Sequence, residues 1–141
     1  MRKSLYILVL FSMCLACGQK TDGKILHTQQ QMKNNNMDTT KLNETVRKAF
    51  EAWQNGDAGS FTSLFTADAR LYDDGNPRDF KKFVKDACGH EKFVSIDKVE
   101  NDGKDIYGRF HTESWGDFRT YFKFHLTQEG KFDALEIGQA E

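Results

Sequence analysis

The chain has 141 residues, 12 of them Phe, and a formal net charge of −1 from 20 Lys and Arg against 21 Asp and Glu. This length is enough for one domain with a hydrophobic core. The charges are balanced and no basic tract follows residue 17, so the chain lacks the positive patch that nucleic-acid binding needs. No nucleic-acid partner is therefore expected.

The N-terminus has the parts of a secretory signal. Two cations, Arg2 and Lys3, precede an apolar run over residues 5–15, which Ala16 and Cys17 follow. As a helix the run would be roughly 16 Å long, about half the thickness of a bilayer core. The segment is therefore expected to insert transiently and not to span the membrane.

The last four residues of this region, Cys14-Leu15-Ala16-Cys17, resemble the lipobox of bacterial lipoproteins, with Cys14 where the pattern prefers Leu. The resemblance implies a signal peptide over residues 1–16 and lipidation of Cys17, which would attach the chain to a membrane of the cell envelope. Gly18 stands where inner-membrane lipoproteins of enterobacteria carry Asp, which indicates the outer membrane in a Gram-negative host. The alternative is an ordinary secretory signal with an incidental cysteine.

Residues 17–38 are polar, rich in Gln and Asn, and without a sustained apolar period. Such a composition is typical of a flexible linker, here between the lipidated cysteine and a domain over residues 39–141. Cys88 would then be the one thiol left, without a partner for an internal disulfide. It is expected to be a small core residue at the end of a helix.

Three helices are expected in the first half of the domain. Apolar residues recur at helical spacing over residues 42–53, and Gly56 can close this helix in the left-handed conformation. Asp57 has the chemistry of an N-cap for a short second helix. Pro77 suits the first turn of a third helix, which Gly89 closes.

Strands dominate the rest of the domain. Alternating apolar residues predict a short strand at 69–73 and longer ones at 93–99, 106–115, 118–127 and 132–137, separated by turns rich in Asn, Asp and Gly. Helices followed by an antiparallel meander predict an α+β domain. Its sheet must curl round helices that gather on one face in order to bury its apolar side.

Two segments resemble the NTF2-like superfamily, which includes SnoaL-like and ketosteroid-isomerase-like proteins. Residues 49–74 hold an aromatic-bearing helix, Gly-Asp, the word Leu-Phe-x-x-Asp-Ala and a strand that ends in acids, and residues 128–139 resemble the last hairpin of the family. The resemblance implies a cone of three N-terminal helices packed in a strongly bent antiparallel sheet, with a pocket inside. Isomerases, cyclases, dehydratases and proteins that only bind or dimerise share this fold, so it does not choose an activity.

The resemblance places Asp73 where isomerase-like members have their general base. Independently, Asp73 shares a strand face with Leu71 and Ala69, an apolar wall that would raise its pKa. The alternative is that Asp73 starts a turn, with its oxygens on backbone amides. The two oxyanion-stabilising donors of the isomerases align with Ala49 and Phe122, which donate nothing, so ketosteroid isomerisation by that mechanism is not expected.

The register of the hairpin formed by 106–115 and 118–127 has two solutions. A two-residue turn would point a polar row into the pocket, where His111 would act with Asp73 as acid and base and Arg109 would hold an anion. A three-residue turn would point this row outward and bury the other side of the strand. Under the first register, the expected catalytic residues are Asp73 and His111, and the expected ligand-binding residues are Phe50, Trp53, Arg109, Glu113, Trp115, Phe122 and Phe124.

Three functions follow. The first is a lipid-anchored envelope protein that binds a small, partly apolar molecule; the second is an isomerase, cyclase or dehydratase that uses Asp73 and His111. The third is a domain that forms a homodimer through the outer face of its sheet around Tyr121 and His125, which requires an exposed apolar patch there. The sequence has neither a glycine-rich phosphate loop nor a metal-ligand spacing, so no cofactor and no metal are expected.

Overall fold

The computed structural model describes residues 37–141. The expected signal peptide, Cys17 and nearly all of the expected linker lie outside these residues. The helices and strands of residues 37–141 are α2 (Glu44–Gln54), α3 (Ala58–Ser63), β1 (Phe65–Asp73), β2 (Asn76–Arg78), α4 (Phe80–Ala87), β3 (Lys92–Glu100), β4 (Asp105–Thr112), β5 (Gly116–Leu126) and β6 (Phe132–Gln139). Within this part of the chain, no helix combines the length and the apolar character needed to cross a membrane.

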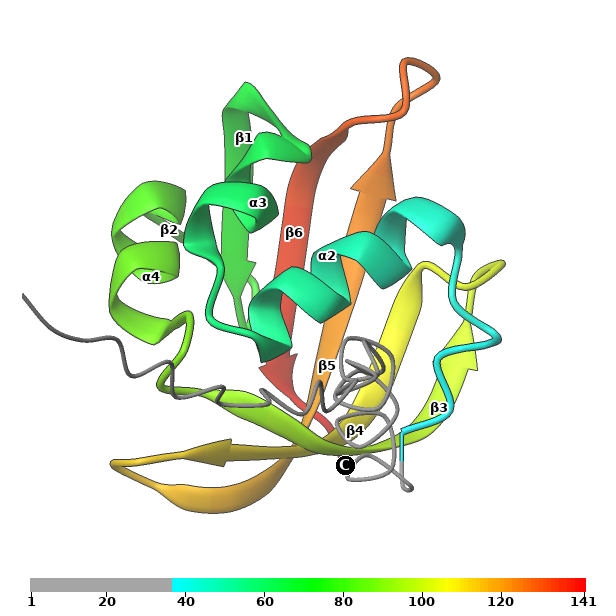
Figure 1. Ribbon diagram of the computed structural model, residues 1–141. Coiled ribbons are helices and arrows are strands. Elements are labelled where there is room, and N and C mark those ends of the chain that lie inside the picture. The colour runs from blue at the N-terminus through cyan, green and yellow to red at the C-terminus, as the bar shows by residue number, and fades with distance from the viewer. Residues whose placement is uncertain (1–36) are drawn as a thin grey trace, which may run out of the picture. The chain divides into compact units, whose positions relative to one another are not determined.

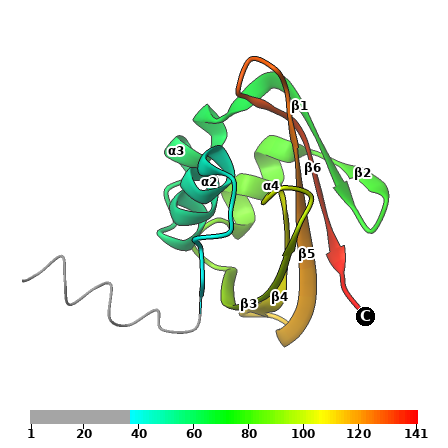
Figure 2. The same ribbon diagram turned by 90° about the vertical axis from the view of Figure 1, so that its right-hand side faces the viewer.

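The strands form one six-stranded sheet in the order β2-β1-β6-β5-β4-β3, and the three helices pack against one of its faces (Figures 1 and 2). This arrangement confirms the expected α+β fold. All neighbouring strands are antiparallel except β1 and β6, which run parallel. The expected wholly antiparallel meander thus holds for β3 to β6 only, because β1 returns to the sheet beside the last strand.

The curvature of the sheet has a local cause in the pairing of β3 with β4. The register shifts twice there, between Phe93 and Ser95 and between Ile96 and Lys98. Such bulges bend a strand and increase its twist. On β4, Gly108 faces the bulge so closely that a Cβ atom would lie 2.0 Å from the carbonyl oxygen of Ser95. Glycine is therefore required where the sheet bends around the helices.

Each helix begins at the side chain of a capping residue. The carboxylate of Asp57 accepts a hydrogen bond from the amide of Ser60 at 2.9 Å, which confirms the predicted cap of α3. The third helix begins after Asp79 and not at Pro77, so that boundary was wrong. Pro77 belongs to β2, because residues 74 and 75 both adopt positive φ and close a two-residue hairpin between β1 and β2.

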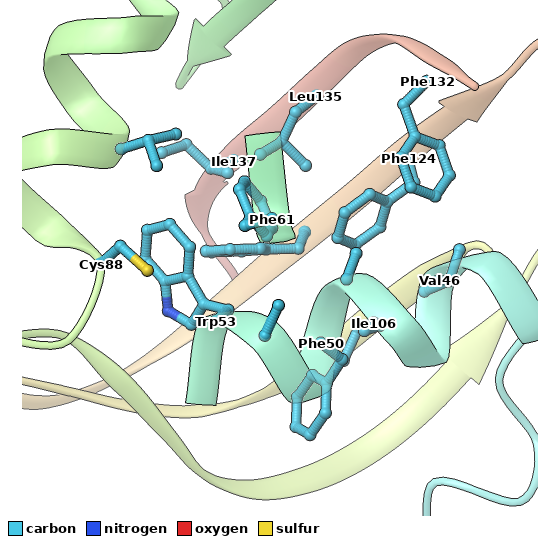
Figure 3. Close-up of a cluster of buried hydrophobic side chains, with 14 of the residues drawn as sticks. Val46, Phe50, Trp53, Phe61, Cys88, Ile106, Phe124, Phe132, Leu135 and Ile137 are labelled. Atoms are coloured by element: carbon cyan, nitrogen blue, oxygen red, sulfur yellow. The ribbon is translucent and has the colours of Figure 1, made fainter. Parts of the chain in front are cut away.

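The core lies between the helices and the concave face of the sheet, and Trp53 is its largest member. Its side chain is 1% exposed, stacks on Phe83 at 5.5 Å between ring centroids, and meets Phe61 and Phe122 edge-on. Figure 3 shows the core residues of α2 reaching toward those of the strands. Cys88 caps α4 and is buried, as expected for a core residue at a helix end, and burial raises the pKa of its thiol.

The hairpin of β4 and β5 has the three-residue turn. Thr112 pairs with Gly116 and Ile106 pairs with Phe122, so the polar-inward register is wrong. Ile106 is fully buried and Phe110 is 3% exposed. Burying these side chains removes much apolar surface from water, whereas the other register would bury a row of charged groups. A change of face follows from an odd slip in register, because side chains alternate along a strand.

Candidate functional site

A cavity of about 500 Å³ opens where β1 and β6 end and where the β4–β5 hairpin projects, at the lower end of the sheet in Figure 1. Helix α4 and the segment that follows it supply the opposite wall. The volume is in the range of about 300–1,000 Å³ that is usual for small-molecule sites. The cavity therefore has the size and the position of the pocket that the fold predicts.

Five aromatic residues of the described part of the chain line the cavity. Phe110 and Phe122, on neighbouring strands, lie 5.5 Å apart between ring centroids, and Phe118 meets Phe110 edge-on at 6.1 Å. Phe83 closes the side toward α4. Trp115, in the turn of the β4–β5 hairpin, lines the cavity while 84% exposed, which is unusual for so large an apolar side chain.

Three carboxylates line the same cavity: Asp73 and Asp74 at the end of β1, and Glu91 before β3. Asp74 accepts a hydrogen bond from the backbone amide of Gln139 at 2.9 Å. Asp73 lies 3.4 Å from the guanidinium of Arg78, a contact between two partly exposed side chains. Within residues 37–141, no group of three or more His, Cys, Asp or Glu side chains is arranged to hold a metal ion.

Glu91 differs from the other two acids. It is half-buried, and its backbone is fixed by a hydrogen bond from its amide to the carbonyl of Ala87 at 2.9 Å. Burial raises the pKa of its carboxyl group, and the negative charge of Asp73 raises it further, against an opposing effect of His90. No described residue donates a hydrogen bond to this carboxylate or forms an ion pair with it. The cavity thus holds a partly desolvated acid without a partner in the described part of the chain.

Asp73 lies where the alternation of β1 predicts. It follows Leu71, which is buried, on the same face, and it lines the cavity. Asp73 also pairs with Asn76 and directly precedes the two-residue turn, so the alternative prediction that it starts a turn is correct as to its position. The side chain that accepts from a backbone amide is nevertheless that of Asp74. Within the described residues, the partner of the Asp73 carboxylate is Arg78.

His111 and Arg109 lie on the face of β4 opposite to Phe110. His111 Nδ1 is 2.6 Å from Asp117 Oδ1, and the guanidinium of Arg109 reaches the other oxygen of Asp117 at 3.3 Å. Neither lines the cavity that Asp73 lines, so the expected pairing of Asp73 with His111 across one pocket is wrong. The physical reason is the register of the hairpin: it places the side chains of Arg109 and His111 on the face of β4 that is turned away from the cavity.

The other predicted ligand-binding residues lie in three different places. Trp115 and Phe122 line the cavity, whereas Phe50, Trp53 and Phe124 pack in the core and do not reach it. Glu113 is exposed in the hairpin turn, 3.5 Å from His90, and lines a separate hollow with His111. Several residues of the cavity were not expected there from the sequence, among them Asp74, Phe83, Glu91 and Phe110.

The outer face of the sheet carries tyrosines and charged groups around Tyr121. Its ring lies 6.3 Å from that of Tyr107, and Lys123 is 4.8 Å above it. Nearby, His125 and Glu136 form a pair at 2.7 Å. Among residues 37–141, the large hydrophobic side chains that are exposed are Val94 and Trp115. The apolar patch expected around Tyr121 and His125 is therefore missing from the described residues, so the outer face of the sheet gives no support to the predicted homodimer.

No protein-family model and no curated protein matches the chain in sequence. Solved structures do match its fold. A putative polyketide cyclase from Sinorhizobium meliloti is 18% identical with a TM-score of 0.58, over 71% of this chain and 98% of that one. An NTF2-like protein of unknown function from Cytophaga hutchinsonii is 13% identical with a TM-score of 0.56, over 72% and 93%.

A third match is the orange carotenoid protein of Anabaena (Nostoc), in a structure that binds canthaxanthin. It is 19% identical with a TM-score of 0.54, over 67% of this chain. The match spans about a third of the length of that protein, 35%. At these identities the likeness shows the fold alone. The fold is that of the NTF2-like proteins, as the resemblance of residues 49–74 and 128–139 implied.

Proposed function

We propose that the chain is a lipid-anchored protein of the cell envelope whose domain binds a small, partly apolar molecule in the cavity beside Asp73. The observation that carries the binding proposal is the cavity itself, about 500 Å³ with aromatic walls. Sites of this size with apolar walls and a few polar groups are typical of small-molecule binding. A protein whose structure matches over 35% of its length binds canthaxanthin, which supports a small-molecule ligand for this chain.

The anchoring part of the proposal depends on the sequence of residues 1–17. Arg2 and Lys3, a short apolar run and Ala16-Cys17 follow one another in the order that is typical of a lipoprotein signal peptide. Each CH₂ group buried in the bilayer contributes about 0.8 kcal/mol, so several acyl chains on one cysteine hold a protein stably at a membrane. The proposed role is binding at the membrane surface, with neither a cofactor nor a metal assigned to it.

A thermal-shift screen of the purified chain against a library of small metabolites tests the binding proposal. The matched variants are Trp115→Ala, which removes an exposed wall of the cavity, and Val94→Ala, which removes an exposed apolar side chain elsewhere. Because both residues are exposed, both variants should fold with a Tm near that of the wild type. A ligand of the cavity should stabilise the wild type and Val94→Ala, and Trp115→Ala less, with roughly tenfold weaker binding.

Two results would contradict the proposal. One is a library in which no compound raises the Tm of the wild type. The other is a set of ligands whose effect on Trp115→Ala equals their effect on the wild type, because such ligands would bind outside this cavity. The same screen repeated with Phe118→Ala probes a second wall that is only half-buried. This variant enlarges the cavity and should change which ligands bind.

A further inference from the structure

We infer that the ligand of this cavity is an organic cation: an ammonium group carried on an apolar body. This inference depends on the proposed function, because it names the class of ligand for the same site. It is carried by the sign of the charges that line the cavity. Asp73, Asp74 and Glu91 contribute carboxylates, and among residues 37–141 no Lys, Arg or His lines the cavity.

The negative charge is a property of this cavity and not of the whole chain, whose net charge is only −1. A hollow of about 390 Å³ between β1, β2 and α4 is lined by Arg70, Arg78 and Lys81, and the one acid that lines it among residues 37–141 is Asp79. The two sites therefore differ in sign although they share the strand β1. Fields inside a concave site are focused by its low-dielectric walls, so the local set of charges decides which ion enters.

Within the cavity, Glu91 is the group that needs a partner. The carboxylate of Asp74 accepts a hydrogen bond from the backbone amide of Gln139, and the carboxylate of Asp73 lies 3.4 Å from the guanidinium of Arg78. Glu91 is half-buried without a hydrogen-bond donor from the described residues. A neutral apolar ligand would remove more water from this carboxylate without supplying a hydrogen bond or an opposite charge. An anionic ligand would add electrostatic repulsion. An ammonium group would supply both a charge and a donor.

The aromatic walls favour the same ligand. The faces of Phe and Trp rings attract cations within about 6 Å, most strongly when water is excluded. Phe83, Phe110 and Phe118 line the cavity together with Glu91, and Trp115 stands exposed at its mouth. Aromatic faces beside a carboxylate form a recurrent way of recognising an alkylated ammonium. The same rings would bury the apolar body of the ligand.

The test uses three probes that share a phenylethyl or benzyl body: 2-phenylethylammonium, 2-phenylethanol and phenylacetate. Calorimetric titration of the purified chain should give a Kd for the ammonium about tenfold lower than that for the alcohol, and weaker binding still for the carboxylate. In Glu91→Gln, which keeps the shape and removes the charge, the ammonium and the alcohol should bind within about threefold of each other. The matched control is Glu129→Gln, an exposed acid in the turn between β5 and β6 that lines no part of the cavity.

If Glu91→Gln fails to fold, Asp73→Asn and the response of the wild type to salt take its place. Either change should reduce the preference for the ammonium over the alcohol. Equal affinity of the wild type for ammonium and alcohol, or a preference that survives in both charge variants, would overturn the inference and leave the proposed binding function standing. Binding of none of the three probes, together with a blank metabolite screen, would overturn both.

Discussion

At the scale of single residues, Glu91 is where the demands of folding and of binding oppose each other. A carboxyl group that a domain buries without a partner destabilises the folded state in its charged form. The raised pKa of Glu91 records this cost, with burial as its main cause, Asp73 as the second and His90 acting against both. Groups that reduce stability in the empty protein are often those that a ligand compensates.

The sign of this effect predicts how stability depends on pH. A carboxyl whose folded-state pKa lies above its unfolded-state pKa contributes stability below the unfolded value, about 4.5 for Glu, and loses it as the pH rises through the folded value. Glu91→Gln should therefore raise the Tm at neutral pH and have little effect at about pH 3.5, where the Glu91 carboxyl is mostly protonated in both the folded and the unfolded state. The rise should stay below the roughly 4–8 °C that 1 kcal/mol produces in a domain of about 100 residues.

Thermal unfolding followed by circular dichroism at the two pH values measures this difference. Glu129→Gln, whose side chain is exposed, supplies the control and should change the Tm by less than about 2 °C at either pH. A Glu91→Gln variant that is less stable than the wild type at neutral pH would mean that the carboxylate has a stabilising partner. Glu91 would then not be an acid that needs the ammonium group of a ligand as its partner.

At the scale of elements, the turn between β3 and β4 fixes the start of α2. Its residues 101–103 all adopt positive φ, and the carbonyl of Gly103 accepts a hydrogen bond from the amide of Asn43, the N-cap of α2, at 3.0 Å. A Cβ atom on Gly103 would lie 2.2 Å from that amide nitrogen and 2.7 Å from the carbonyl oxygen of Lys41. The contact is between backbones, so a side-chain movement cannot relieve it.

Gly103→Ala should consequently be more destabilising than a glycine substitution at another left-handed position. Gly130, in the β5–β6 turn, has nearly the same φ of +79° and nothing near its missing Cβ. Gly130→Ala should cost about 1–2 kcal/mol for its conformation alone, and Gly103→Ala at least about 2 kcal/mol more. Urea unfolding of the two variants measures the difference. Equal free energies of unfolding would show that α2 and the turn separate without cost.

The elements also show which features could be predicted from sequence. Local chemistry determines where helices begin, so Asp57 was correctly identified as a cap. The turn residues did not determine the β4–β5 register, because Gly116 with its φ of +72° begins β5 instead of forming the turn. The burial of Ile106 and Phe110 decides it, and burial belongs to the whole sheet. A sequence pattern alone does not measure how much apolar area each register hides.

The site was likewise predictable only where local sequence patterns determine it. Asp73 follows from strand alternation, since it is two residues after the buried Leu71. Glu91 has no periodic neighbour, because it lies in the short connection between α4 and β3. Only the packing of that connection against the end of β1 brings its charge to Asp73. Loop residues reach a site through tertiary structure, which is why sequence periodicity misses them.

At the scale of the whole molecule, the proposed anchor and the proposed ligand class support each other. Membrane surfaces that carry anionic lipids attract cations, and an apolar body adds partitioning into the same interface. A domain held at that surface would therefore meet amphiphilic cations at a higher concentration than in bulk solution. Anchoring at Cys17 would raise the occupancy of the cavity without any change in its affinity.

Lipidation of Cys17 can be separated from the ordinary secretory signal by metabolic labelling. In a bacterial host that processes lipoproteins, labelled palmitate should enter the wild-type chain, which should fractionate with membranes. Cys17→Ser should lose the label and leave the membrane fraction, because no thiol then follows Ala16 for acylation. The matched control is Cys14→Leu, which removes the other thiol of this segment and supplies the residue that the lipobox pattern prefers, so the variant should retain both properties. A wild-type chain that takes up no label, or a Cys17→Ser chain that keeps it, would refute anchoring at this residue and favour the secretory signal.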